Sequence, residues 1–172
     1  MSAAAANSGG LPNVKRSASR LAAVQALYQV ASTQSDYTKV VQDFLSGRLG
    51  GIAIDEDPDT EVETHVKLAD MDQAMFSTLV SVACSREDEI DGMIDASLSA
   101  EWPKERLELI VRAILRTAVA ELLGALEAPA RMTNSEYVDI THAFYSGYEP
   151  KMVNAVLDKI ARTLHGPKLA AS

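Results

Sequence analysis

Apolar residues recur every three or four positions along most of the chain, the spacing of α-helices that bury one face. The strongest such stretch is 104–126, where apolar positions cover roughly 220° of the helical wheel, well beyond the ~100° stripe of a surface helix. A helix that is apolar over so much of its circumference must be packed on at least two sides. We therefore predict one long helix over 104–126 that forms the central rod of a helical bundle.

Six further stretches have the helical period and are bounded by loop-forming residues. They lie at about 17–31, 36–49, 66–84, 86–98, 134–145 and 150–164. No stretch shows the two-residue alternation of a strand between turns. The pattern predicts an all-α fold, a compact bundle of about seven helices over 14–165, between a disordered tail at 1–13 and a short tail at 166–172.

Side chains that cap helix ends sharpen some of these boundaries. Ser85 and Asp88 form a cap-like pair before the fourth helix, and Thr133 and Glu136 form a capping box before the sixth. Pro150 suits the first turn of the last helix, because its missing N–H would have no partner there in any case.

The charge of the chain is unevenly distributed. The net charge is −8, which argues against a general nucleic-acid binder. No acid precedes Asp36, whereas Lys15, Arg16 and Arg20 together carry +3, so the remainder carries −11. Cations at the start of a helix oppose its dipole, which makes these three residues candidates for binding an anionic partner. A solvated helix start remains the simpler explanation on these residues alone.

No pattern for a metal site, cofactor or enzyme reaction is present. Cys84 is the only cysteine, and the three histidines at 65, 142 and 165 do not have metal-ligand spacing. The acidic loop at 54–63 begins like a calcium loop but lacks the glycine and the final glutamate that such a loop needs. We therefore predict a non-enzymatic protein with no cofactor.

Two further features bear on location and on the core. The sequence shows no signal peptide and no apolar run of ~18 residues, and its lone cysteine suits a reducing compartment, so we expect a cytoplasmic protein with no membrane partner. Glu121 lies at the edge of the apolar arc of the central helix. It is either a buried acid with a perturbed pKa or, more commonly in proteins, a paired structural carboxylate.

Three segments together resemble the NusB family of bacterial transcription antitermination factors. They are KRSASRLAAVQALY at 15–28, RAILRTAVAEL at 112–122, and the C-terminal run from EYVDITHAF at 136–144 to MVNAVLDKI at 152–160. The resemblance covers most of the chain and implies an all-helical, RNA-binding domain over 14–165. It further implies binding of the boxA element of ribosomal RNA leaders together with the small-subunit ribosomal protein NusE. That pair joins RNA polymerase, NusA and NusG to promote processive transcription of ribosomal RNA.

The resemblance also assigns candidate RNA contacts, in two groups. The first lies on the N-terminal helix and the second at the start of the last helix; they are Lys15, Arg16, Arg20, Gln25 and Tyr28, and Tyr148, Lys151, Met152 and Asn154. Cations on phosphates, aromatics on bases and amides on base edges are the means by which proteins hold single-stranded RNA. The family usually has phenylalanine where Met152 stands, which removes one stacking ring here.

The surface for the ribosomal protein is predicted from charge alone. That partner is basic, so the exposed acids Glu105 and Glu108 are its candidate contacts. Two other interpretations stay open. The chain could be a helical module that binds only protein, or an enzyme fragment, since ribosomal RNA cytosine methyltransferases can carry a domain of this family; the absence of a cofactor-binding domain from the sequence disfavours the latter.

Overall fold

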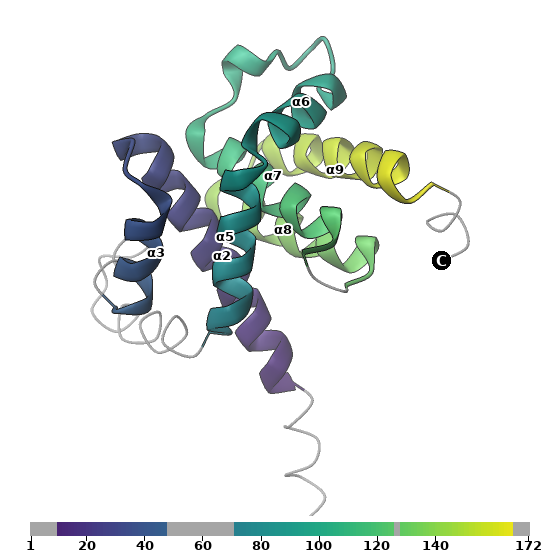
Figure 1. Ribbon diagram of the computed structural model, residues 1–172. Helices are drawn as coiled ribbons and strands as arrows, with labels where there is room; N and C mark the ends of the chain where they lie inside the picture. Colours follow the sequence, from purple (N-terminus) through teal and green to yellow (C-terminus); the bar gives the residue numbers. More distant parts are fainter. Residues whose placement is uncertain (1–9, 48–70, 126–127, 167–172) are drawn as a thin grey trace, which may run out of the picture. The chain divides into compact units, whose positions relative to one another are not determined.

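The computed structural model describes residues 10–47, 71–125 and 128–166. These residues form seven α-helices and two short helical turns, with no strand among them, which confirms the all-α prediction. The elements are α2 Gly10–Thr33, α3 Tyr37–Leu45, α5 Gln73–Ser85, α6 Glu87–Ser97, the 3₁₀ turn η1 Lys104–Arg106, α7 Leu109–Ala120, the π turn η2 Glu121–Ala125, α8 Ala130–Phe144 and α9 Glu149–His165 (Figure 1). The chain divides into two units, Met1–Thr78 and Leu79–Ser172.

The first unit is held together by α2, α3 and the start of α5. α2 packs against α3, and Val24, Leu27 and Val40 are buried. Phe44 of α3 stacks on Phe76 of α5 with ring centroids 5.5 Å apart. Aromatic pairs at this separation add to the free energy gained by burial alone, so the pair ties α3 to the start of α5.

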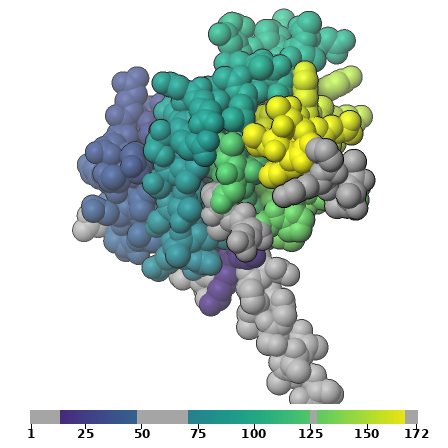
Figure 2. Space-filling view, turned by 45° about the vertical axis from the view of Figure 1, so that its right-hand side comes forward, coloured from purple at the N-terminus to yellow at the C-terminus, as the bar shows by residue number. Residues whose placement is uncertain are grey.

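The second unit is built around α7. α7 contacts α6, α8 and α9, and α8 also packs along α9. Eight of its residues are buried: Val111, Ala113, Ile114, Leu115, Thr117, Ala118, Val119 and Ala120. Figure 2 shows the green α8 and the yellow α9 side by side on one face of this unit. The prediction of a central rod surrounded by other helices is confirmed for this helix.

The central helix is shorter than predicted. Residues 104–106 form a 3₁₀ turn, Leu107 and Glu108 are extended, and α7 begins only at Leu109. The charged side chains of the 3₁₀ turn are all exposed, so no buried face holds this segment in an α-helix. At the other end Gly124 has a φ of 97°, which breaks the helix; Leu126 lies outside the described residues.

Both predicted helix caps are wrong. α6 begins after Arg86, and the hydroxyl of Ser85 instead donates to the carbonyl of Val82. α8 begins at Ala130, which places Thr133 inside the helix, where its hydroxyl donates to Glu121. In each case the hydroxyl donates to an oxygen elsewhere, and no backbone N–H of a helix start donates to it, an outcome that local sequence does not reveal.

Three other boundaries shift. α2 begins at Gly10, so 10–13 of the predicted tail are helical, as a proline in the first turn of a helix permits. α3 ends at Leu45 because Gly47 takes a positive φ of 79°. α9 begins at Glu149 with Pro150 in its first turn, as predicted, and Gly166 caps its end. The predicted tail residues 1–9 and 167–172, the acidic loop 54–63, and 66–70 of the predicted third helix lie outside the described residues.

Candidate nucleic-acid interface

The N-terminal group of predicted RNA contacts lies on α2 in the first unit. Lys15 is exposed, Arg16 and Gln25 are half-buried, and Tyr28 is 42% exposed. The helical spacing of Tyr28 from Val24 and Leu27 predicts a buried position for its ring, and the structure shows that this prediction is wrong. Arg16 and Tyr28 are separated by roughly 18 Å along the axis, since an α-helix rises 1.5 Å per residue. Lys15, Gln25 and Tyr28 offer a cation, an amide and an aromatic ring on one half of the helix circumference, whereas Arg16 lies on the side opposite to Gln25.

Arg20 does not belong to this surface. Its side chain is only 1% exposed, and it takes part in an interaction inside the fold. The sequence contained a signal for this, because Arg20 precedes Val24 and Leu27 by four and seven residues and so shares their buried stripe. A guanidinium held in the interior cannot reach a phosphate, so in this structure Arg20 is a core residue of the first unit.

The neighbouring contacts explain how position 20 comes to be covered. Ser19 is buried and donates its hydroxyl to the carbonyl oxygen of Asp72, 2.8 Å away, and to that of Lys15, also at 2.8 Å. The carboxylate of Asp72 accepts from the backbone N–H of Met75 at 3.0 Å, which caps the first turn of α5. The start of α5 is thereby fastened onto this part of α2, and solvent is excluded from it.

The C-terminal group lies in the second unit, at the start of α9. Tyr148 is 72% exposed, Lys151 and Asn154 are exposed, and Met152 is half-buried. Tyr148, Lys151 and Met152 line a groove of about 410 Å³. The other wall of this groove comes from the end of α6 and the loop after it, which includes Trp102. Asn154 is not part of the groove lining.

This groove unites three chemical features that suit single-stranded RNA. Tyr148 and Trp102 supply aromatic surface for a base, and Lys151 supplies a positive charge for a phosphate. In the first turn of α9 only Glu149 and Lys151 have backbone N–H groups without an intrahelical partner, because Pro150 has no N–H and that of Met152 donates to the carbonyl of Tyr148; N–H groups at a helix start favour an anion. Its volume is within the range of small-molecule pockets.

The two acids predicted to meet a basic protein lie on different elements. Glu105 is exposed on the 3₁₀ turn, and Glu108 is exposed in the extended residue before α7. Glu108 accepts a hydrogen bond from the hydroxyl of Tyr145 at 2.6 Å, which links the end of α8 to the start of α7. Both carboxylates are on the surface, as the prediction required.

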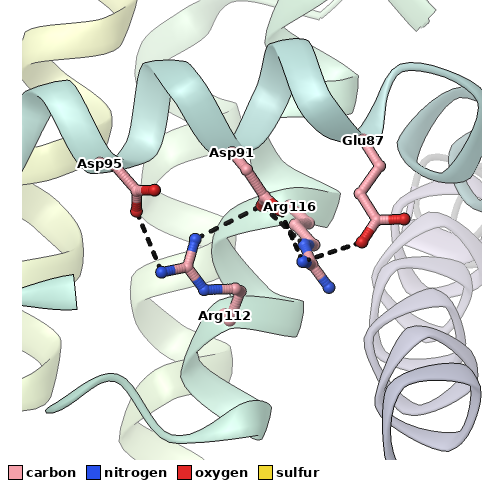
Figure 3. Close-up of polar contacts among 5 residues, drawn as sticks. All are labelled: Glu87, Asp91, Asp95, Arg112 and Arg116. Carbon is pink, nitrogen blue, oxygen red and sulfur yellow. Dashed lines mark hydrogen bonds and ion pairs between the residues drawn. The ribbon is translucent and has the colours of Figure 1, made fainter. Parts of the chain in front are cut away.

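Two arginines of the RAILR segment are engaged inside the protein. Arg116 donates twice to Asp91, at 2.8 and 2.7 Å, and is 3.0 Å from Glu87. Arg112 lies 3.4 Å from Asp91 and 3.0 Å from Asp95 (Figure 3). The three acids lie along α6 and the two arginines along α7, so this network joins two helices. These cations are structural and are not candidates for phosphate contacts.

The network shifts the pKa of Asp91. Burial raises the pKa of this carboxyl, but the hydrogen bonds and charges of Arg116 and Arg112 outweigh that effect and lower the pKa below its ordinary value. The Asp91 hydrogen bond in turn raises the pKa of Arg116, against the opposing effect of burial. The paired charges are therefore favoured in the folded state. The spacing of apolar residues does not predict this network, but the arginines that interrupt the most apolar helix are a signal that acidic partners exist.

Glu121 is a paired structural carboxylate, the more common of its two predicted alternatives. It is 2% exposed and accepts hydrogen bonds from the hydroxyls of Thr133 at 2.8 Å and Tyr137 at 3.0 Å. Both donors come from α8, so the carboxylate links α8 to the end of the central helix. It does not line the groove.

Within the part of the chain that the structure describes, no group of three or more His, Cys, Asp or Glu side chains is placed to hold a metal ion. Cys84 is half-buried and not in a disulfide, and His142 is exposed; His65 lies outside the described residues. None of the helices described is both long and apolar enough to cross a membrane.

Comparison with known proteins decides the family. The NusB family model matches residues 17–162. The transcription antitermination protein NusB of Rhodospirillum rubrum is 48% identical over 156 residues, 87% of this chain and 84% of the relative. That of Granulibacter bethesdensis is 37% identical over 155 residues, 90% of this chain and 92% of the relative. The chain belongs to the NusB family.

A solved NusB structure agrees with the fold. The T. maritima NusB structure matches with a TM-score of 0.64 and 23% identity, over 91% of this chain and 97% of that chain. NusB proteins are transcription antitermination factors, so family membership confirms the predicted antitermination class and the prediction that the chain is not an enzyme. The methyltransferase-fragment interpretation is set aside for the same reason, since the chain covers most of these NusB relatives.

Proposed function

We propose that this protein binds the boxA element of nascent ribosomal RNA together with the ribosomal protein NusE, and thereby promotes processive transcription of ribosomal RNA in the cytoplasm. The complex would contain RNA polymerase, NusA and NusG. Membership of the NusB family supports the general class, and the exposed candidate RNA contacts support the molecular role.

The observation that carries the proposal is the groove at the start of α9. Aromatic side chains there can stack on a base, and Lys151 and the N-terminus of α9 can bind a phosphate. The exposed Lys15 and Tyr28 of the first unit add a second set of contacts of the same chemistry. Arg20 is left out of the proposed contacts, because its charge is buried.

The ribosomal protein is proposed to meet the acidic surface of Glu105 and Glu108. Both carboxylates are exposed, and rim charges of opposite sign speed association and favour the correct partner. Because Glu108 already accepts from Tyr145, a partner cation would have to share this oxygen or displace the phenol. Glu105 has the less encumbered position on the 3₁₀ turn, and we expect its substitution to affect association more than that of Glu108.

The first test is binding of a boxA RNA and a scrambled RNA of equal composition, with and without NusE. We expect selective binding of boxA that NusE tightens, and we expect Arg16→Ala and Lys151→Ala each to weaken it. Arg131→Ala is the matched control, because Arg131 is an exposed cation of α8 outside both groups. Equal binding of both RNAs, unchanged by the first two substitutions, would overturn the proposal.

A protein-only interaction module is the second candidate, and the net charge of −8 favours it. Under that alternative, NusE or another basic protein would bind without RNA, and Arg16→Ala and Lys151→Ala would change nothing. Glu105→Gln would still weaken the complex. The same experiment therefore separates the two candidates.

A further inference from the structure

The groove beside α9 has a wall that none of the predicted RNA contacts supplies. This wall comes from the end of α6 and the loop that follows, and consists of Ser97, Ser99, Glu101 and Trp102. It lines the groove together with Tyr148 and Met152. All belong to the second unit. The groove therefore presents a carboxylate and two hydroxyls beside its aromatic and apolar surface, which is more than a phosphate contact needs.

We propose that this groove holds one unstacked base of the bound RNA and that Glu101 makes it prefer guanine. The inference rests on the proposed RNA-binding function and names the base that this part of the surface selects. Trp102, Tyr148 and Met152 provide faces against which a planar base can pack.

The charges along the groove determine where the phosphate of the nucleotide lies and where its base lies. A carboxylate repels a phosphate, so the backbone belongs at Lys151, which is exposed at the first turn of α9. The base then points toward Glu101. A carboxylate only accepts hydrogen bonds, and thus selects a base by the donors on its edge.

Guanine fits this requirement best among the four bases. Its N1–H and its exocyclic amino group lie side by side on the Watson–Crick edge and can donate to both oxygens of one carboxylate. Adenine and cytosine offer one amino group there, and uracil offers one ring N–H. A bidentate pair discriminates against the wrong base by roughly tenfold or more.

Trp102 supplies a second, independent observation. Its indole nitrogen is buried and has no hydrogen-bond partner among the residues that the structure describes. Buried donors are rarely left unpaired in proteins. A carbonyl oxygen of a base in the groove would satisfy this donor once the ring turns toward it; guanine, cytosine and uracil carry such an oxygen, and adenine does not.

The test uses the fact that Trp102 is the only tryptophan of the chain, so its fluorescence reports on this groove alone. Four RNAs are compared, each a uridine decamer with one central residue that is A, C, G or U. Binding is followed by Trp102 fluorescence and, separately, by anisotropy of a labelled RNA. We expect the guanine decamer to bind about tenfold tighter than the all-uridine decamer and to change Trp102 fluorescence most.

Glu101→Gln is expected to reduce this preference to about twofold or less, because the amide offers only one acceptor oxygen. The measured quantity is the ratio of the two affinities, since removal of a negative charge strengthens binding of every RNA. Asp88→Asn is the matched control: it removes one negative charge from the exposed start of α6, outside the groove lining, and should leave the ratio unchanged. Glu101 is exposed, so folding of the variant can be verified by its helical circular dichroism.

Four outcomes would overturn the inference. The first is equal affinity for the four decamers, and the second is a guanine preference that Glu101→Gln leaves unchanged. Either result would contradict this inference but leave the proposed function standing, provided that boxA RNA binds. Binding seen by anisotropy with no change in Trp102 fluorescence would place the base elsewhere. If neither boxA RNA nor any decamer binds, both the proposed function and this inference are wrong.

Discussion

At the scale of single residues, burial determines whether a charged side chain is structural or is available to a binding partner. Arg20 and Glu121 are 1% and 2% exposed, and neither is available to a partner. Arg16, one turn before Arg20 on the same helix, is only half-buried. Two residues of one chemical type in one motif therefore have different roles, because only one of them is buried.

The buried carboxylate of Glu121 gives the first prediction. Tyr137→Phe removes one of its hydroxyl donors and leaves an acceptor oxygen in the core without that hydrogen bond. We expect a loss of about 1.5–3 kcal/mol in the free energy of unfolding, measured by urea denaturation. Tyr145→Phe removes an exposed hydroxyl from Glu108 and should cost about 0.5 kcal/mol or less. Equal effects of the two substitutions would show that burial does not set the strength of these bonds.

At the scale of elements, α6 and α7 are joined by both apolar and charged contacts. Ile90 and Ile94 of α6 are fully buried, as are Ile114 and Leu115 of α7. Asp91, beside Ile90, reaches two arginines along the edge of this contact (Figure 3). Burial supplies most of the stabilisation, whereas the ion pairs require a defined register of the two helices.

Asp91→Asn tests the contribution of the network to stability. It leaves two arginines, each with 16% of its side chain exposed, without their shared carboxylate. We expect a loss of about 1–3 kcal/mol, between the values of exposed and fully buried pairs, measured by denaturant unfolding. Glu89→Gln breaks a pair with Arg86 in which both side chains are more than 40% exposed, and should leave the free energy of unfolding nearly unchanged. A cost for Asp91→Asn as small as that of Glu89→Gln would contradict the prediction.

The lowered pKa of Asp91 also predicts how the network depends on pH. A carboxyl whose pKa is lower in the folded state contributes stability above its unfolded value, near 3.8, and loses it as the pH falls through the folded pKa. The stability difference between the native chain and Asp91→Asn should therefore be constant from about pH 7 to pH 5 and should shrink below about pH 4. Unfolding free energies of both proteins between pH 7 and pH 3 measure it. If this stability difference grew as the pH fell, the pKa of Asp91 would be raised in the folded state, and the prediction would be wrong.

At the scale of the whole molecule, an acidic chain binds RNA only through local groups of cations. With a net charge of −8, bulk attraction to a polyanion is absent, and the proposed contacts must supply the affinity. Lys15 and Arg16 lie in the first unit and Lys151 in the second, so each group can be tested by itself.

Salt dependence distinguishes phosphate contacts from other effects of these substitutions. Each phosphate contact contributes roughly 0.7 to the slope of log affinity against log salt for a single strand. Lys151→Ala and Arg16→Ala should each lower the slope of boxA binding by about 0.7, and the double variant by about 1.4. A titration between 50 and 200 mM salt, a range that resolves such slopes, measures this. Arg20→Lys should leave the slope unchanged, because position 20 is buried.

The order and type of the helices followed from sequence alone, because the spacing of apolar residues is a local property of each helix. The buried stripe of α9 at Val153, Val156, Leu157 and Ile160 and the surrounded character of α7 were both predictable for that reason. The NusB resemblance also rested on local segments, and it located the candidate RNA contacts at both ends of the chain.

Only the tertiary structure decided which polar groups face inward. Thr133 donates its hydroxyl to Glu121 instead of capping a helix, and Arg20 is buried. Trp102 and Glu101 line the same groove as Tyr148. These contacts join residues far apart in the chain, so their formation depends on how helices pack, which local patterns do not record. A polar side chain takes whichever partner the packed helices bring within reach, and that choice separates a structural charge from a binding one.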